Sequence, residues 1–186
     1  MQARDWSKPS MLSSRYYPLY PSLVGLLLGL LQTGLYLQLS FTLSSSIGTY
    51  LLVTLCWLLG SAIGALWVSR SEMSLRVGLI LALIAYAACG WFLSLAPFES
   101  SRWILYAFLV ILTGLYPGLF FARMAPYYRA RTLFFLENNG FILGLAAGTL
   151  LFMIAGRAIL WLAPAVVAMV VLLWDELFLR SLSAEK

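Results

Sequence analysis

The chain has 186 residues, with 12 Lys and Arg, 7 Asp and Glu and no His, which gives a formal net charge of +5. Because 62% of its residues are hydrophobic, only 10% are charged and the mean hydropathy is +0.92, a soluble globular domain is excluded. We expect an all-α, polytopic membrane protein with six transmembrane helices. The basic residues are dispersed over the connecting loops, which argues against nucleic acid as a partner.

Six apolar stretches follow one another, each near the roughly 20 residues that a helix needs to cross about 30 Å of hydrocarbon. We expect an interfacial or cytoplasmic segment over 1–20, a transmembrane bundle over 21–178 and a cytoplasmic tail over 179–186. Residues 132–136 are expected to extend the fifth helix, because its purely apolar part is short for a crossing. Pro117 is expected to bend the fourth helix. The predicted spans cover about 21–43, 49–68, 77–96, 103–122, 132–156 and 158–173.

Lys and Arg are distributed unequally between the two sides of this predicted bundle. Only Arg102 and Arg157 fall on one side. Since short loops rich in Lys and Arg stay in the cytoplasm, both termini are expected to be cytoplasmic, in a bacterial-type cytoplasmic (inner) membrane. Anionic lipid head groups are the expected counter-charge. The basic residues of the other side are Arg4, Lys8, Arg15, Arg70, Arg76, Arg123, Arg129, Arg131, Arg180 and Lys186.

Glycines recur every four residues in three of the predicted helices. This spacing places them on one helical face, where two backbones can approach closely and gain van der Waals contact. Such faces meet either within one chain or against a partner subunit, and the spacing alone does not decide between the two. The glycines are Gly25 and Gly29 in the first helix, Gly60 and Gly64 in the second, and Gly140, Gly144 and Gly148 in the fifth.

One candidate polar cluster lies in the fifth predicted helix. Glu137, Asn138 and Asn139 follow Arg131 by about 9 to 12 Å along the helix, at 1.5 Å per residue. Ion-coupled transporters place an acid inside the membrane, where burial favours its protonated form, and Glu137 is the one candidate for that role. The alternative is an interfacial cluster in which Glu137 pairs with a basic residue. Candidates for that pairing are Arg76, Arg129 and Arg131.

The first predicted helix carries Gln32, Tyr36 and Gln38, whose burial in hydrocarbon is costly without hydrogen-bond partners. Gln32 and Tyr36 share one helical face through their four-residue spacing. These side chains line a substrate cavity, or they hydrogen-bond to a neighbouring helix or a partner subunit.

Two stretches resemble the membrane region of the spermidine synthase-like membrane proteins. One is SSSIGTY at 44–50, followed by GSAIGAL at 60–66, and the other is RTLFFLENNGFILGLAAG at 131–148. The resemblance implies a bundle similar to half of a major facilitator superfamily transporter. The family's aminopropyl transferase domain has no counterpart in this chain, so polyamine synthesis is not implied. The acid that the facilitator signature requires soon after Gly64 is also missing, since Trp67, Val68 and Ser69 follow.

The residues needed for most catalytic and cofactor chemistry are missing. Without His, the usual zinc sites and imidazole-based triads are excluded, and two separated Cys do not hold an iron–sulfur cluster. We therefore expect no catalytic residue, metal or cofactor, and no enzyme. The first hypothesis is a non-catalytic integral membrane subunit that anchors, scaffolds or assists a larger assembly, with other membrane proteins or a homodimer as partners. The second is a small half-size transporter protomer that acts as a dimer and is proton-coupled through Glu137.

Overall fold

The computed structural model describes residues 19–68 and 73–184, so that residues 1–18 of the N-terminal segment predicted over 1–20 lie outside this part. Every secondary-structure element in the described ranges is a helix, which confirms the all-α prediction. The long helices are α2 (Leu19–Thr42), α3 (Ile47–Val68), α4 (Leu75–Leu95), α5 (Trp103–Met124), α6 (Ala130–Ala155) and α7 (Ile159–Ala184), and the short 3₁₀ helices are η1 (Ser100–Arg102) and η2 (Gly156–Ala158).

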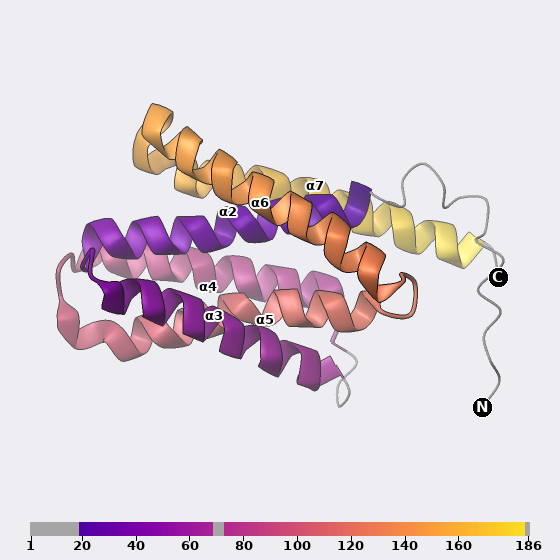
Figure 1. The fold of residues 1–186 in the computed structure, drawn as a ribbon, viewed down its shortest axis with the longest axis horizontal. Helices are drawn as coiled ribbons and strands as arrows, with labels where there is room; N and C mark the ends of the chain where they lie inside the picture. Colours follow the sequence, from indigo (N-terminus) through magenta and orange to yellow (C-terminus); the bar gives the residue numbers. More distant parts are fainter. Residues whose placement is uncertain (1–18, 69–72, 185–186) are drawn as a thin grey trace.

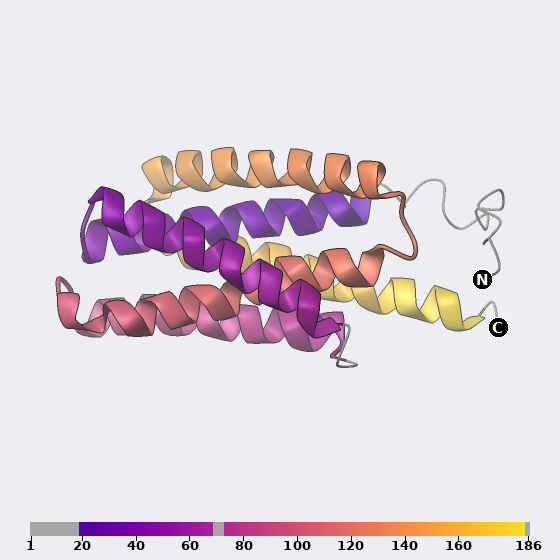
Figure 2. The same cartoon turned by 60° about the horizontal axis from the view of Figure 1, so that its bottom comes forward.

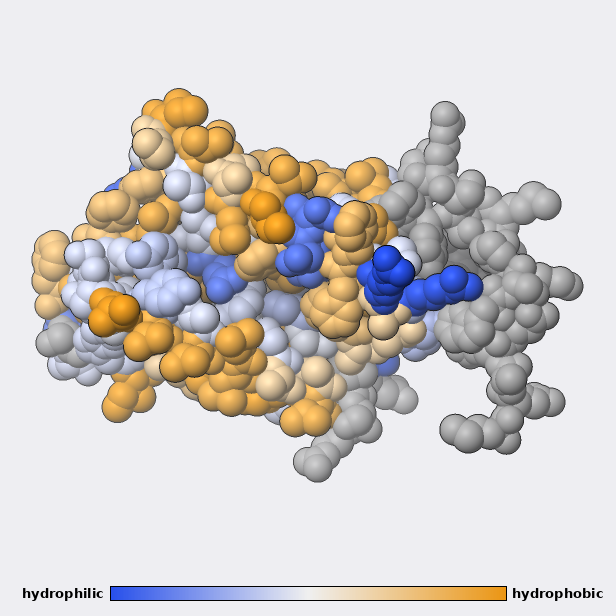
Figure 3. All heavy atoms as spheres, viewed as in Figure 1, coloured by the Kyte–Doolittle hydropathy of each residue, from blue (hydrophilic) through white to orange (hydrophobic). Residues whose placement is uncertain are grey.

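Five helical segments of the described chain are long and apolar enough to cross a membrane. Four of them correspond to α2, α3, α4 and α5, and the fifth, Ala130–Trp174, has 45 residues and contains the break between α6 and α7. Apolar side chains cover much of the surface seen in Figure 3. Length and composition therefore identify a helical integral membrane protein with several crossings.

The helix ends agree with the predicted spans except at the last one. Thr132 to Leu136 belong to α6, as expected, and α6 begins at Ala130. Gly156, with φ +68°, starts the short turn η2 in a conformation that favours glycine. The final helix continues to Ala184, beyond the end predicted near Leu173. Residues 174–184 contain no Gly or Pro to stop it, so the helix extends past the apolar stretch.

The six long helices surround a core that α2 and α5 supply most fully (Figure 1). The apolar windows of α2 and α5 are 67% and 61% buried, against 28% for α3 and 22% for the segment containing α6 and α7. Figure 2 shows α6 lying along α2 and α3 crossing the bundle diagonally. The peripheral helices α3, α6 and α7 therefore present broad apolar surfaces outward.

The basic residues separate along the bundle axis. Successive long helices alternate in direction, so α2 begins and α7 ends at the same end of the molecule (Figure 1). Arg76, Arg123 and Arg129 lie at helix termini of that end, whereas Arg102 and Arg157 precede α5 and α7 at the opposite end. For the basic residues that the structure describes, the charge asymmetry in the sequence is thus an asymmetry between two ends of the fold.

Candidate functional site

Helices α2 and α6 cross closely through glycine residues. A Cβ atom on Gly25 would overlap the Glu137 carbonyl oxygen, and one on Gly144 would lie 2.9 Å from Gly29 Cα. The Ser22 hydroxyl adds a hydrogen bond of 3.2 Å to the Leu136 carbonyl oxygen. Backbone atoms thus meet across this interface, where only glycine leaves sufficient space.

A second glycine crossing joins α3 to α5. A Cβ atom on Gly60 would lie 2.9 Å from the Gly114 carbonyl carbon, and one on Gly118 would lie 2.6 Å from the Ala65 nitrogen. Gly64 likewise faces the backbone of Leu115. Both crossings join helices that run in the same direction but are not adjacent in the sequence.

Pro117 lies inside α5, beside this second crossing. Proline removes one backbone donor from its helix and displaces the carbonyl groups of the preceding turn. The Ser61 hydroxyl of α3 lies 3.1 Å from the Gly114 carbonyl oxygen and 3.0 Å from the Trp57 carbonyl oxygen. A hydroxyl from the neighbouring helix therefore stabilises the backbone next to Pro117.

Gln38 takes part in a buried polar connection between three helices. Its side chain is 3% exposed, and its amide nitrogen donates a 2.8 Å hydrogen bond to the Tyr86 hydroxyl of α4. Tyr86 in turn donates to the Leu160 carbonyl oxygen of α7. Gly34 and Gly90 leave the space that these side chains occupy, because a Cβ atom on Gly34 would overlap the Tyr86 hydroxyl and one on Gly90 would overlap the Gln38 side-chain oxygen Oε1. This chain of hydrogen bonds connects α7 to α2 and α4.

A further set of polar contacts closes the same end of the bundle. Arg157 of η2 donates a 3.0 Å hydrogen bond to the Thr42 hydroxyl at the end of α2. The Thr42 carbonyl oxygen accepts from the Phe98 backbone at 2.7 Å. Next to it, Arg102 and Glu99 form an exposed ion pair at 2.9 Å. The two basic residues on this side of the bundle are thus both engaged with neighbouring groups.

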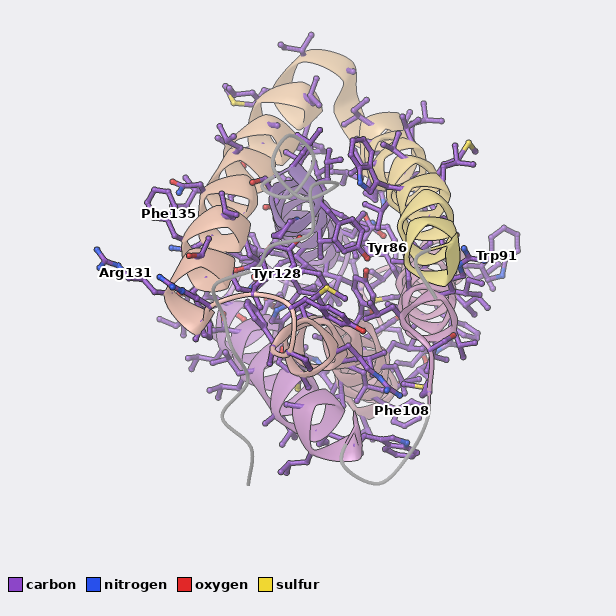
Figure 4. All side chains as sticks on the ribbon, turned by 90° about the vertical axis from the view of Figure 1, so that its right-hand side faces the viewer. Tyr86, Trp91, Phe108, Tyr128, Arg131 and Phe135 are labelled. Atoms are coloured by element: carbon purple, nitrogen blue, oxygen red, sulfur yellow. The ribbon has the colours of Figure 1, made fainter. Side chains whose placement is uncertain are left out.

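Glu137 lies at the α2–α6 crossing and is only 8% exposed. In the described part of the chain its carboxylate has no hydrogen bond and no ion pair. Arg131 and Phe135 point outward from α6, away from the bundle (Figure 4). Within the described residues, no ion pair joins Glu137 to Arg76, Arg129 or Arg131, the three partners that the interfacial alternative offered.

The two asparagines that follow Glu137 face outward. Asn138 and Asn139 are both exposed, and the Asn139 amide donates a 2.7 Å hydrogen bond to the Phe135 carbonyl oxygen of its own helix. Figure 3 shows hydrophilic side chains over the N-terminal half of α6. Glu137, Asn138 and Asn139 are thus consecutive in sequence but do not form one cluster in space.

Gln32 and Tyr36 lie at the surface of α2, separate from Gln38. Gln32 is half-buried and Tyr36 is 38% exposed, and the Tyr36 ring meets the Tyr50 ring of α3 edge-on at 6.1 Å. Gln38 follows Gln32 by six positions, so that the two amides project from different faces of the helix. The predicted polar group of the first helix therefore divides into a buried connector and a surface pair.

One hollow among the described residues is lined without polar side chains. This hollow lies between α2, α6 and α7, and glycine, proline and aliphatic residues line it. Within the described ranges, no three His, Cys, Asp or Glu residues come close enough to bind a metal ion. The lining residues are Leu30, Gly148, Leu151, Ile159, Leu160, Ala163 and Pro164.

Some of the residues in these interfaces were not singled out from the sequence as packing or hydrogen-bonding residues. Gly114 and Gly118 lie beside the predicted bend at Pro117, and their four-residue spacing matches that of the other glycine faces. Tyr86 carries no local signal for its contact with Gln38, since a tyrosine inside an apolar span is equally compatible with an exposed position. Ser22 and Ser61 were hidden in the same way among other small residues of the spans.

Comparisons with protein-family models, curated proteins and solved structures found no match for this chain. The resemblance to the spermidine synthase-like membrane proteins therefore stays a prediction from the two sequence stretches.

Proposed function

We propose that this chain is a non-catalytic integral membrane subunit that anchors, scaffolds or assists a larger membrane assembly. One observation supports this most: several polar side chains inside the bundle connect helices. Gln38 and Tyr86 connect α2, α4 and α7, and Ser61 connects α3 to α5. Polar groups used in this way stabilise a fixed arrangement, which an anchoring or scaffolding subunit requires.

The peripheral helices offer the surface that such a subunit needs. α6 buries one narrow stripe against α2, formed by Leu133, Glu137 and three glycines, and leaves its remaining faces outward. α7 likewise buries Leu160, Ala168 and Val171 and exposes much of its remaining surface. Two adjacent helices held by narrow stripes leave wide faces for the helices of other membrane proteins.

The proposal includes a topology of six crossings. α6 and α7 each exceed 20 residues, and the turn at Gly156 reverses the chain between them, so each is proposed to cross once. The end of the bundle that carries Arg76, Arg123 and Arg129 is proposed to face the cytoplasm, next to anionic lipid head groups. This places both termini in the cytoplasm and suits a bacterial-type inner membrane.

A second candidate function is a half-size transporter protomer that works as a dimer. The burial of Glu137 without an ion pair in the described chain favours it, because an unpaired acid inside a membrane protein is a frequent proton-binding group. The fixed interhelical connections made by Gln38, Tyr86 and Ser61 favour the subunit instead. The resemblance to half of a facilitator bundle is compatible with either role.

Native mass spectrometry of the chain, released gently from its own membrane, separates the two functions. A stoichiometric set of different proteins is expected if the chain is a subunit. A lone chain, or a homodimer that binds no other protein and carries a small molecule, would contradict the subunit proposal. In that case uptake by vesicles containing Glu137→Gln, compared with wild type, tests the transporter directly.

A further inference from the structure

One face of the bundle carries polar groups where a lipid-facing surface is normally apolar. It is formed by Gln32 and Tyr36 of α2 together with Tyr50 of α3, and we call it the α2–α3 polar face. Figure 1 shows α2 uncovered between α6 and α3, and Figure 3 shows hydrophilic side chains in this region.

The position of Gln32 makes this face costly if lipid covers it. Gln32 lies near the middle of α2, which spans Leu19–Thr42, so its depth is that of the hydrocarbon core. Its side chain is half-buried, and no hydrogen bond within the described chain involves its amide. Acyl chains offer no donor or acceptor, and an unsatisfied amide in hydrocarbon costs several kcal/mol.

We infer that the α2–α3 polar face is covered by the same face of a second copy of this chain. A two-fold axis normal to the membrane brings identical faces together and keeps every residue at the depth of its counterpart. Gln32 would then meet the amide of the other copy, and an amide is complementary to itself because it both donates and accepts. The Tyr36 hydroxyl lies one turn further along α2 and also both donates and accepts hydrogen bonds.

This inference goes beyond the proposed function and does not depend on it. Two copies that pair through α2 leave most of α7 and the outer surface of α4 free for other membrane proteins. The pair is therefore compatible with a subunit that brings two copies into a larger assembly. Failure to find other proteins would contradict the proposed function without affecting the pairing.

Site-specific photo-crosslinking in the purified full chain tests the pairing. A photoreactive phenylalanine analogue replaces Tyr36 and, as a control, Trp91, which is 61% exposed and points away from the side on which Phe135 lies (Figure 4). In phospholipid vesicles, the probe at position 36 is expected to give at least about tenfold more covalent homodimer than the probe at position 91. Equal yields, or a higher yield from position 91, would overturn the inference.

Substitutions of Gln32 supply a second, independent measurement. Gln32→Leu keeps the size of the side chain and removes its hydrogen bonds, so the dimer is expected to dissociate about 3- to 30-fold more readily in lipid. Gln32→Asn retains an amide and is expected to retain most of the dimer. Helix content and elution volume of the monomer check folding. Unchanged dimerisation of a folded Gln32→Leu chain, or crosslinking of position 36 only to a different protein in native membranes, refutes the pairing with a second copy.

Discussion

Replacing Gly144 by alanine tests the close backbone contact between α2 and α6. The added Cβ would overlap the Leu26 carbonyl oxygen and would lie 2.9 Å from Gly29 Cα and 3.0 Å from the Leu30 nitrogen. These are backbone atoms, which no rotamer change can move. Ordinary contact between such atoms starts near 3.4 Å, so α2 and α6 must separate by at least about 0.5 Å.

The expected cost of Gly144→Ala is about 2–3 kcal/mol, the upper part of the range for overpacking a tight interface. Gly148→Ala is the matched control, because its Cβ would meet side-chain atoms, Thr33 Cγ2 at 3.3 Å and Leu30 Cδ2 at 3.4 Å. These atoms can shift by a few tenths of an ångström, so a cost below about 1 kcal/mol is expected. Both changes alter helix propensity equally, which removes that effect from the comparison.

The assay is reversible unfolding in mixed micelles of mild and denaturing detergent, followed by circular dichroism and by the fluorescence of the native tryptophans. The measured quantity is the difference in unfolding free energy between the two variants. Equal destabilisation by Gly148→Ala and Gly144→Ala, or an unchanged transition in both variants, would contradict a close backbone contact between α2 and α6 at Gly144.

Four further substitutions, one of them a control, test the polar side chains of the bundle. Tyr86→Phe removes the acceptor of the buried Gln38 amide and is expected to lower the unfolding free energy by about 1–3 kcal/mol, whereas Tyr36→Phe at the surface is expected to change the stability of the monomer by less than about 0.5 kcal/mol. Ser61→Ala removes the hydroxyl next to Pro117 and is expected to cost about 0.6 kcal/mol, and at most about 1.7, by the same unfolding assay. Glu137→Gln is expected to retain partner proteins at wild-type stoichiometry in native mass spectrometry; retained partners together with lost solute uptake would contradict a purely scaffolding role.

Helix positions were predictable because hydrophobic length dominates in a membrane protein. A run of about 20 apolar residues has few alternatives to a helix, since backbone groups in hydrocarbon must be paired within the segment. The described helices start and end within a few residues of the predicted spans, apart from the end of α7. Hydropathy shows only where the apolar stretch of α7 ends. The helix itself continues to Ala184, because no Gly or Pro lies in residues 174–184 to end it.

Helix pairing was not predictable, for a physical reason. Four-residue glycine spacing identifies a face but contains no information about its partner. The face of Gly25 and Gly29 meets α6, and the face of Gly60 and Gly64 meets α5, although neither pair of helices is adjacent in the chain. The choice depends on complementary shapes along entire helices, such as the space that Gly114 leaves for the Trp57 backbone.

The candidate polar residues show the same limit. A four-residue spacing correctly placed Gln32 and Tyr36 on one face of α2, because helical geometry is local. Whether an amide is buried or exposed depends on distant residues, and only the fold shows that Gln38 meets Tyr86 of α4. Glu137 and Asn138 illustrate the converse, since adjacent residues on a helix point about 100° apart and reach different environments.

The narrow contact stripe of α6 connects stability to assembly. Because Gly140 and Gly144 bring its backbone against α2, the attraction depends on short-range contact that falls steeply with distance. A small separation at Gly144 would therefore displace all of α6, including Glu137 and the outward surface that carries Phe135. Substitutions in the stripe are thus expected to weaken any contact made through the opposite face of α6 while the α3–α5 crossing stays intact. A partner that binds across both α2 and α6 would, by the same linkage, protect the crossing and raise the stability of the whole bundle.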